Sequence, residues 1–164
     1  MSLYTKIEVA GQFRNAMRAH AASVTIITTS IDGQRFGMTA TAVTSLTMRP
    51  PALTICVNHD ASIHRPLLAR GLFGVNILRA GDAEFCERFS KLPSADRFSI
   101  GSWVDDENGI PILSRSQASV KCRVGPSLEF GSHSIIVGEV LEALVSPDVA
   151  PLLYVSGKYR SLHP

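Results

Sequence analysis

The sequence predicts a mainly β protein, built as an antiparallel barrel with a few flanking helices. Stretches rich in β-branched residues follow one another at close spacing, and residues that favour turns separate them. Few helical patterns lie between these stretches, whereas a parallel sheet needs a helix after nearly every strand. Short strands at close spacing are typical of antiparallel barrels.

The composition is that of a globular domain. The chain has 164 residues, of which 45% are hydrophobic and 18% charged. A net charge of +2, with the basic residues scattered, does not favour nucleic-acid binding. No uncharged apolar run approaches the ~20 residues that a membrane span needs, and no secretory signal pattern opens the chain. Three widely spaced cysteines, Cys56, Cys86 and Cys122, indicate unpaired thiols in a reducing cytoplasm.

The opening segment predicts an amphipathic helix over residues 5–21. Phe13, Met17 and Ala21 recur at helical spacing, while the arginines lie off that stripe. We expect this helix to lie over the body of the protein. Asp32-Gly33 is a hairpin signal that follows the first expected strand.

The remaining pattern alternates strands with two short helices. The second strand is expected to break near Thr44, and Pro66 fits only the first turn of its helix. Asp82 is a candidate N-cap. The acidic stretch 97–112 is expected to be a solvated loop. Strands are expected at 23–30, 35–47, 52–58, 72–78, 118–124, 134–144 and 152–159, and helices at 62–70 and 82–90.

Several catalytic signatures are absent from the sequence. It contains neither G-x-G-x-x-G after a strand, nor a phosphate-binding G-x-x-x-x-G-K-[ST] loop, nor a G-x-S-x-G elbow. His59, Asp60 and His64 match no strong metal pattern, so no metal site is predicted. No catalytic triad is predicted either.

The segment GMTATAVTSL, residues 37–46, is dense in hydroxyl groups. In extended backbone Thr39 and Thr41 project to one face, while Ala40 and Ala42 lie on the other. Hydroxyls and free N–H groups at a strand edge can bind a phosphate or the polar edge of a heterocycle, and the small alanines leave space for a flat ring. Ser62 adds a possible anion-binding element at a helix N-terminus. The alternative is ordinary strand chemistry.

A set of motifs runs in order along nearly the whole chain. It resembles the short-chain flavin reductase family, and the chain as a whole, 1–164, is then a single flavin reductase-like domain with the FMN-binding split barrel fold of Greek-key type. The motifs are a helix leading into an apolar-Thr-Thr strand (13–29), GMTAT (37–41) with Ser45 and Pro50-Pro51, ICVN (55–58) with Ser62, FGVNIL (73–78), GSHSIIVGEV (131–140), and PLLY (151–154) with Gly157, Tyr159 and Arg160.

The resemblance implies an NAD(P)H:flavin oxidoreductase. Such a protein transfers a hydride from NADH or NADPH to FMN or FAD and supplies reduced flavin to a separate monooxygenase. The resemblance also implies a homodimer, with the flavin bound near the interface between the two subunits. Other members of the family reduce corrinoid or ferric acceptors. A non-enzymatic flavin-binding electron carrier is a further alternative, as is an interaction module without a cofactor. The related pyridoxamine phosphate oxidase type expects more basic residues around the phosphate than are seen here.

The resemblance also implies a set of site residues. His133 is expected nearest the nicotinamide and the reactive face of the flavin, as the catalytic residue. The family's usual Asp before this His is Ser132 here, and its frequent Asn in the first motif is Thr41. The residues expected to bind the cofactors are Thr39, Ala40, Thr41, Ser45 and Leu46 around the flavin ring, Asn58 and Ser62 toward the ribityl and phosphate, Ser23 toward the nicotinamide, and Tyr159 and Arg160 closing the pocket.

Overall fold

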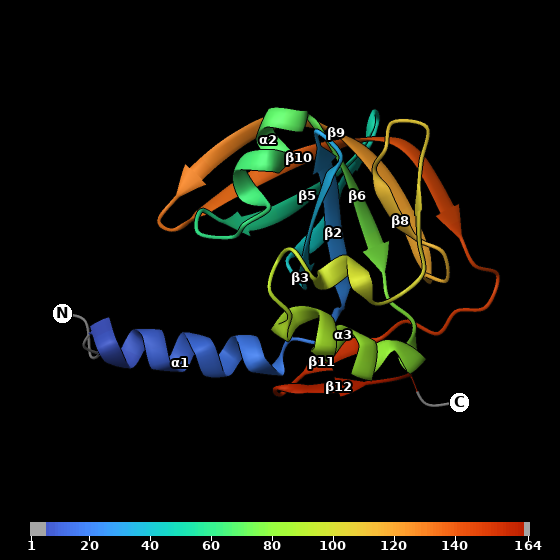
Figure 1. The fold of residues 1–164 in the computed structure, drawn as a ribbon. Helices are drawn as coiled ribbons and strands as arrows, with labels where there is room; N and C mark the ends of the chain where they lie inside the picture. Colours follow the sequence, from blue (N-terminus) through green and yellow to red (C-terminus); the bar gives the residue numbers. More distant parts are fainter. Residues whose placement is uncertain (1–5, 163–164) are drawn as a thin grey trace.

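A single antiparallel sheet forms the body of the protein (Figure 1). The structure, a computed structural model, describes residues 6–162. Seven strands follow the order β3-β2-β6-β9-β10-β5-β4, and every neighbouring pair is antiparallel. The predicted mainly β, antiparallel class is thereby confirmed. The strands are β2 Thr25–Ile31, β3 Gln34–Ala40, β4 Val43–Met48, β5 Pro51–Asn58, β6 Leu72–Ile77, β9 Ala118–Phe130 and β10 His133–Val145.

The sheet closes on itself at a two-residue link. The edge strands β3 and β4 are consecutive in the chain, and only Thr41 and Ala42 join them. The N–H of Cys56 in β5 donates to the carbonyl of Ala42 at 3.1 Å. The strand pattern at 35–47 therefore does break, but at residues 41–42 and not at the expected Thr44. Beyond the break, β4 carries a register shift between Ser45 and Thr47.

Smaller elements surround the barrel. The helices α2 and α3 pack against it, and a three-stranded sheet of order β1-β11-β12 lies beside its lower end as drawn in Figure 1. These elements are α1 Lys6–Ala19, α2 His64–Arg70, α3 Ala83–Lys91, the short 3-10 helices η1 Ala80–Asp82 and η2 Arg97–Ser99, and the strands β1 Ala22–Ser23, β7 Trp103–Asp105, β8 Pro111–Leu113, β11 Leu153–Val155 and β12 Lys158–Arg160.

Two apolar cores lie on opposite faces of strand β2. One core fills the barrel around Ile27, Ile55 and Phe73, and the other joins the barrel to α3 through Ile26 and Phe89. Because both faces of β2 are covered, its β-branched residues are buried almost throughout. No helix within residues 6–162 is long and apolar enough to cross a membrane.

The first helix differs most from its prediction. Helix α1 ends at Ala19, and Thr5 lies outside the described residues. It extends away from the barrel (Figure 1), and none of its residues is buried. Phe13 on its apolar stripe is 65% exposed. The prediction that this helix lies over the body of the same chain is wrong, because hydrophobic spacing identifies an apolar face without identifying what covers it.

The stretch 97–112 was expected to be a solvated loop, and this prediction is also wrong. It contains η2 and the β7–β8 hairpin, and Ile110 is fully buried. Phe98 and Trp103 pack with Phe89 of α3, with ring centroids 4.9 to 5.8 Å apart. The acidic residues hide this role in the sequence, because Asp106 faces Lys121 of β9 and not solvent.

The other expected strands and helices are present with adjusted boundaries, apart from one strand and one helix cap. The expected strand 152–159 is two strands, β11 and β12, joined by a turn at Ser156 and Gly157. Asp82 occupies the N-cap position of α3, but its carboxylate accepts the N–H of Arg79 at 2.8 Å and does not cap the helix.

Candidate functional site

A cavity of about 750 Å³ lies where the barrel closes. It is bounded by the second half of α1, the closing segment 41–44, Thr54 and Cys56 of β5, and the β11–β12 turn at 154–157. We call it the closure cavity. Its wall includes the hydroxyl-bearing Thr41 and Thr44, so part of the segment that the sequence singled out does face a ligand-sized space.

The C-terminal end of α1 is anchored to the turn between β11 and β12. The N–H of Ser156 donates to the carbonyl of Arg18 at 2.7 Å, and the Arg18 guanidinium donates to the carbonyl of Ser156 at 3.3 Å. Gly157 has a φ of +75°, and a Cβ there would lie 2.7 Å from that guanidinium. The closing turn thus needs glycine both for its backbone conformation and for the approach of Arg18.

The closure cavity has a positive wall. Arg14 and Arg18 both line it, and His20 lies beside them. Within residues 6–162, no carboxylate side chain lines this cavity. Guanidinium groups bind phosphate oxygens in pairs of hydrogen bonds, so this wall fits a phosphorylated ligand.

His133 begins β10 at the open end of the barrel. It is the direct cross-strand partner of Asn58, and its side chain is exposed. Ser132 Oγ lies 2.9 Å from His133 Nδ1, so a hydroxyl stands where the family's usual carboxylate would be. The Oδ1 atom of Asn58 accepts the N–H of Asp60 at 2.8 Å and thereby shapes the turn after β5.

A second histidine is buried directly behind this end of β10. His64 Nε2 lies 2.8 Å from the hydroxyl oxygen of Ser134, the neighbour of His133. Burial lowers the pKa of His64, and His59, whose ring centroid is 5.0 Å away, lowers it further. A neutral imidazole therefore packs under the start of β10. The sequence carried no signal for this role, because His64 and Ser134 are 70 residues apart.

Ser62 meets a residue that the sequence analysis missed. Its hydroxyl lies 2.9 Å from the hydroxyl of Ser94, in the loop that follows α3. Arg97 holds that loop: Nε donates to the carbonyl of Leu92 at 3.1 Å, and Nη1 donates to the carbonyl of Gly37 at 2.6 Å. No motif marks Ser94, and only the folded chain brings it to Ser62.

Thr39 lies on the side of β3 that faces Phe89 of α3 and Phe98 of η2. It shares a face with Gly37, where a Cβ would come within 2.9 Å of the Phe89 and Phe98 rings. Thr39 and Ala40 are half-buried and do not line the closure cavity, whereas Thr41 does. The hydroxyl-rich segment therefore contributes to two adjoining surfaces.

The other predicted residues are more dispersed. Ser45 and Leu46 are exposed on β4, and Ser23 pairs with Leu153 next to the cavity-lining Ala22. The Tyr159 hydroxyl points into the protein and donates to the Cys86 sulfur at 3.4 Å. Burial, together with this contact, raises the pKa of Tyr159. Arg160 lines a different cavity, of about 310 Å³, with Ala80, Ala83 and Leu152.

Several lining residues of the closure cavity were not predicted from the sequence. The sequence marks Arg14 and Arg18 only as residues off the apolar stripe of the helix, and Cys56 only as an unpaired thiol. Their relevance depends on the direction in which α1 leaves the barrel.

The protein is therefore an antiparallel β-barrel with a basic, hydroxyl-lined cavity beside the link between its edge strands. Such a lining fits a phosphorylated cofactor. Residues 17–163 match the flavin reductase like domain. The chain is 37% identical over 159 residues to the reductase component of the FADH(2)-dependent resorcinol hydroxylase of Rhizobium sp. (strain MTP-10005), covering 95% of this chain and 89% of that protein. It is 36% identical to the FMN reductase (NADH) RutF of Variovorax paradoxus (strain S110), covering 92% and 84%. This protein belongs to the flavin reductase like family.

Solved structures agree with this assignment. The NADH:FAD oxidoreductase SgcE6 of Streptomyces globisporus C-1027 superposes with a TM-score of 0.90 at 30% identity, over 100% of this chain and 99% of that one. The flavin reductase component BorF of a bacterial two-component tryptophan halogenase gives a TM-score of 0.85 at 30% identity, over 93% and 98%. The split barrel fold that the motifs implied is thereby confirmed.

Proposed function

We propose that this protein is an NAD(P)H:flavin oxidoreductase that transfers a hydride to FMN or FAD and supplies the reduced flavin to a separate monooxygenase. The observation that carries the proposal is the closure cavity, which joins two arginines and three threonines in a space of about 750 Å³. Family membership gives the reaction class. Relatives named as NADH enzymes favour NADH, and both FMN and FAD occur among their names.

The residues present fit a flavin and a nicotinamide nucleotide. Such cofactors carry the two-electron chemistry themselves, so the protein needs to bind, orient and exclude water. Arg14 and Arg18 neutralise phosphate groups, and the hydroxyls of Thr41 and Thr44 donate to the polar edge of a ring or to a ribityl chain. The small side chains of Cys56 and Ala42 leave room for the ligand beside these hydroxyls.

His133 is proposed as the residue nearest the reacting atoms. Because Ser132 lies at Nδ1, the Nε2 atom is the one left to face a ligand. Asn58 lies directly across from it on β5, and the neutral His64 beneath Ser134 stabilises this end of the strand.

The surface around Thr39, Ser62 and Ser94, next to the closure cavity, is proposed to hold the rest of the flavin. Thr39 and Ala40 would lie along the ring, and Ser62, now joined by Ser94, toward the phosphate. The other proposed cofactor contacts, argued from the resemblance alone, are Ser23, Ser45, Leu46, Tyr159 and Arg160.

We further propose a cytoplasmic homodimer. The apolar stripe of α1 is exposed, as are Leu46 and Met48 on the outer strand β4, at 54% and 75%. A second copy covering these surfaces would also enclose the closure cavity, whose outer wall is α1.

The test is oxidation of NADH and NADPH by the purified protein with and without FMN or FAD, followed by absorbance of the reduced nicotinamide. Rapid flavin-dependent oxidation is expected. Tight flavin binding without turnover would instead identify an electron carrier, and absence of flavin binding would overturn the proposal.

A charge-neutralising variant tests the cavity itself. We expect Arg14→Gln to weaken binding of the phosphorylated cofactor about tenfold, because one cationic donor is lost from the wall. Arg88→Gln, exposed on α3 and outside the cavity, is the matched control and should bind like the wild type. If Arg14→Gln binds the cofactor as tightly as Arg88→Gln does, the phosphate does not contact this wall of the closure cavity.

A further inference from the structure

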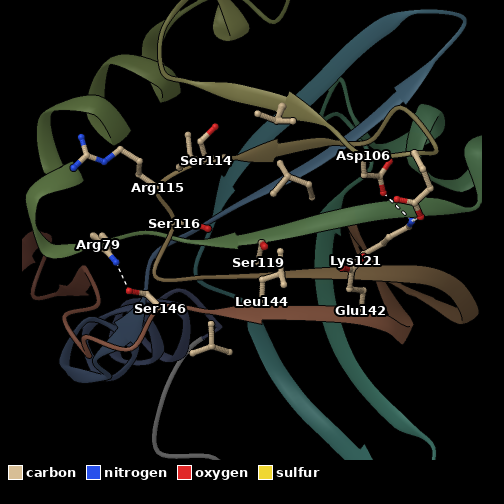
Figure 2. A pocket seen from close by; sticks show the side chains of 15 residues that line it. Arg79, Asp106, Ser114, Arg115, Ser116, Ser119, Lys121, Glu142, Leu144 and Ser146 are labelled. Carbon is tan, nitrogen blue, oxygen red and sulfur yellow. Dashed lines mark hydrogen bonds and ion pairs between the residues drawn. The ribbon is translucent and has the colours of Figure 1, made fainter.

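A second cavity, of about 580 Å³, lies on another part of the barrel (Figure 2). Its walls are the β7–β8 hairpin, the loop 114–116, the start of β9, and the end of β10 with Ser146. We call it the hairpin cavity. It shares no lining residue with the closure cavity. It adjoins the end of β10, a strand of 13 residues, opposite to His133, and a strand of that length spans roughly 40 Å when extended.

One end of the hairpin cavity is basic. Arg79 and Arg115 lie there with the hydroxyl groups of Ser114, Ser116 and Ser146 (Figure 2). The Arg79 guanidinium donates through Nη2 to the Ser146 hydroxyl. Its Nε atom is buried and has no hydrogen-bond partner in the part of the chain that the structure describes.

The charge of Arg79 is also unmatched. Across residues 6–162, no carboxylate forms an ion pair with Arg79 or with Arg115, whereas the structure does pair Arg35, Lys91, Lys121 and Arg123. A buried N–H donor without an acceptor costs free energy, so the surroundings of Arg79 do not compensate its guanidinium fully. A planar anion at this end would match the charge of Arg79 and accept from the guanidinium N–H groups that line the cavity.

The opposite end is acidic but largely neutralised. Lys121, whose side chain is 8% exposed, pairs with Asp106 at 2.9 Å and also with Glu107. Glu142 lines the same end and has no ion pair among the described residues (Figure 2). This end therefore favours a hydrogen-bond donor on the ligand and repels a second anion.

The middle of the cavity is apolar. Leu144 and the small Ser119 lie between the two ends (Figure 2), and Ile112 and Leu113 also line the cavity. A flat apolar body fits these walls, and the volume lies within the range of about 300–1,000 Å³ that is usual for small-molecule sites.

We propose that the hairpin cavity binds an organic anion: a carboxylate or phosphate at Arg79, a flat apolar body over Leu144, and a hydrogen-bond donor toward Glu142. The site stands apart from the proposed flavin chemistry and needs none of its residues. Both an aromatic hydroxy acid and a nucleotide have these chemical features. Measuring the binding of one compound of each kind distinguishes the two classes of ligand.

The experiment is isothermal titration calorimetry of the full chain with three probes. para-Hydroxybenzoate carries the carboxylate, ring and donor, AMP represents the nucleotide source, and para-hydroxybenzamide is the uncharged match of the first. We expect saturable binding of an anionic probe and at least about tenfold weaker binding of the amide, because the amide offers no charge to Arg79. The anion that binds shows whether the ligand class is an aromatic hydroxy acid or a nucleotide.

Two variants locate the binding. Arg79→Gln should weaken the anion at least about tenfold, while Arg88→Gln on α3 leaves it unchanged. Because Arg79 also contacts Ser146, a second variant, Leu144→Glu, places a carboxylate in the cavity from a side chain that is 60% exposed, where folding tolerates it. Loss of binding in both variants, with NADH oxidation retained, supports the proposal. Unaltered binding in both, or no binding of either anion to the wild type, overturns it.

Discussion

The three thiols differ in their surroundings. Burial raises the pKa of the Cys86 thiol and raises the pKa of Cys122 to about 12. Cys56 is half-buried and lines the closure cavity. We therefore expect iodoacetamide to alkylate Cys56 alone in the native protein, because the thiolate is the reactive form and the other two thiols are inaccessible.

Saturating flavin or NADH should slow this alkylation, since either ligand would cover Cys56. Mass spectrometry of tryptic peptides, with and without the ligand, measures the effect. Urea-unfolded protein is the control and should label all three cysteines. Equal labelling of Cys56 with and without every cofactor would contradict its place in the binding site.

His133 can be tested by separating turnover from binding. We expect His133→Ala to lower kcat for NADH oxidation at least about tenfold, because a group that positions the reacting atoms is lost. Flavin affinity, measured by fluorescence titration, should stay near the wild-type value. Ser132→Ala keeps the imidazole and removes only its Nδ1 partner, so a smaller loss is expected. A wild-type kcat in His133→Ala would exclude the role.

At the scale of elements, one buried ion pair ties the β7–β8 hairpin to the barrel. Burial acts to raise the pKa of Asp106, but Lys121 and the N–H groups of Ile110 and Asn108 outweigh it and hold the pKa below its ordinary value. A carboxylate with a lowered pKa contributes stability that is complete above its unfolded pKa and is lost as pH falls through the native one.

Asp106→Asn should therefore make the free energy of unfolding depend less on pH in the acid range. At neutral pH we expect the variant to be less stable by about 2 kcal/mol, because Lys121 loses a buried partner. Between about pH 5 and pH 3 the wild type should lose stability more steeply than the variant. Urea unfolding at the two pH values measures this. Asp60→Asn, on an exposed turn, should keep the wild-type slope; a variant slope as steep as that of the wild type would refute the assignment.

At the scale of the whole molecule, α1 is the feature that the monomer leaves unexplained. Val9 is 51% exposed on the stripe that also carries Phe13. If a second copy covers this stripe, Val9→Asp should weaken the dimer about tenfold or more, because a charge would enter an apolar interface. Asn15→Asp, on the opposite face of the helix, should have no effect. Sedimentation velocity distinguishes the two, and an unaltered distribution for Val9→Asp would place the interface elsewhere.

The barrel could be predicted from local patterns, whereas its surroundings could not. The strand periods, Asp32-Gly33 and Pro50-Pro51 are short-range signals, so β2 to β5 appear close to their expected ranges. The packing of 97–112 depends on pairing with Lys121 and on contacts with α3, which no local pattern records. An acidic stretch in the sequence therefore resembles a solvated loop even when the fold buries it.

Sequence motifs mark only part of the candidate site. Thr41, Asn58 and His133 lie in motifs, and the structure places Thr41 on the closure cavity and the other two opposite each other. Ser94 and Arg14 carry no motif, and their relevance depends on tertiary contacts alone. Arg160 lies in the closing motif, yet the structure places it by another cavity.

The link of Thr41 and Ala42 has a consequence for the order of folding. The same two residues join the last pair of barrel edges and line the closure cavity, so the cavity does not exist until the barrel is closed. A ligand held there stabilises contacts that are absent from any open-barrel intermediate. Cofactor binding should therefore slow the unfolding of this protein while leaving its refolding rate nearly unchanged.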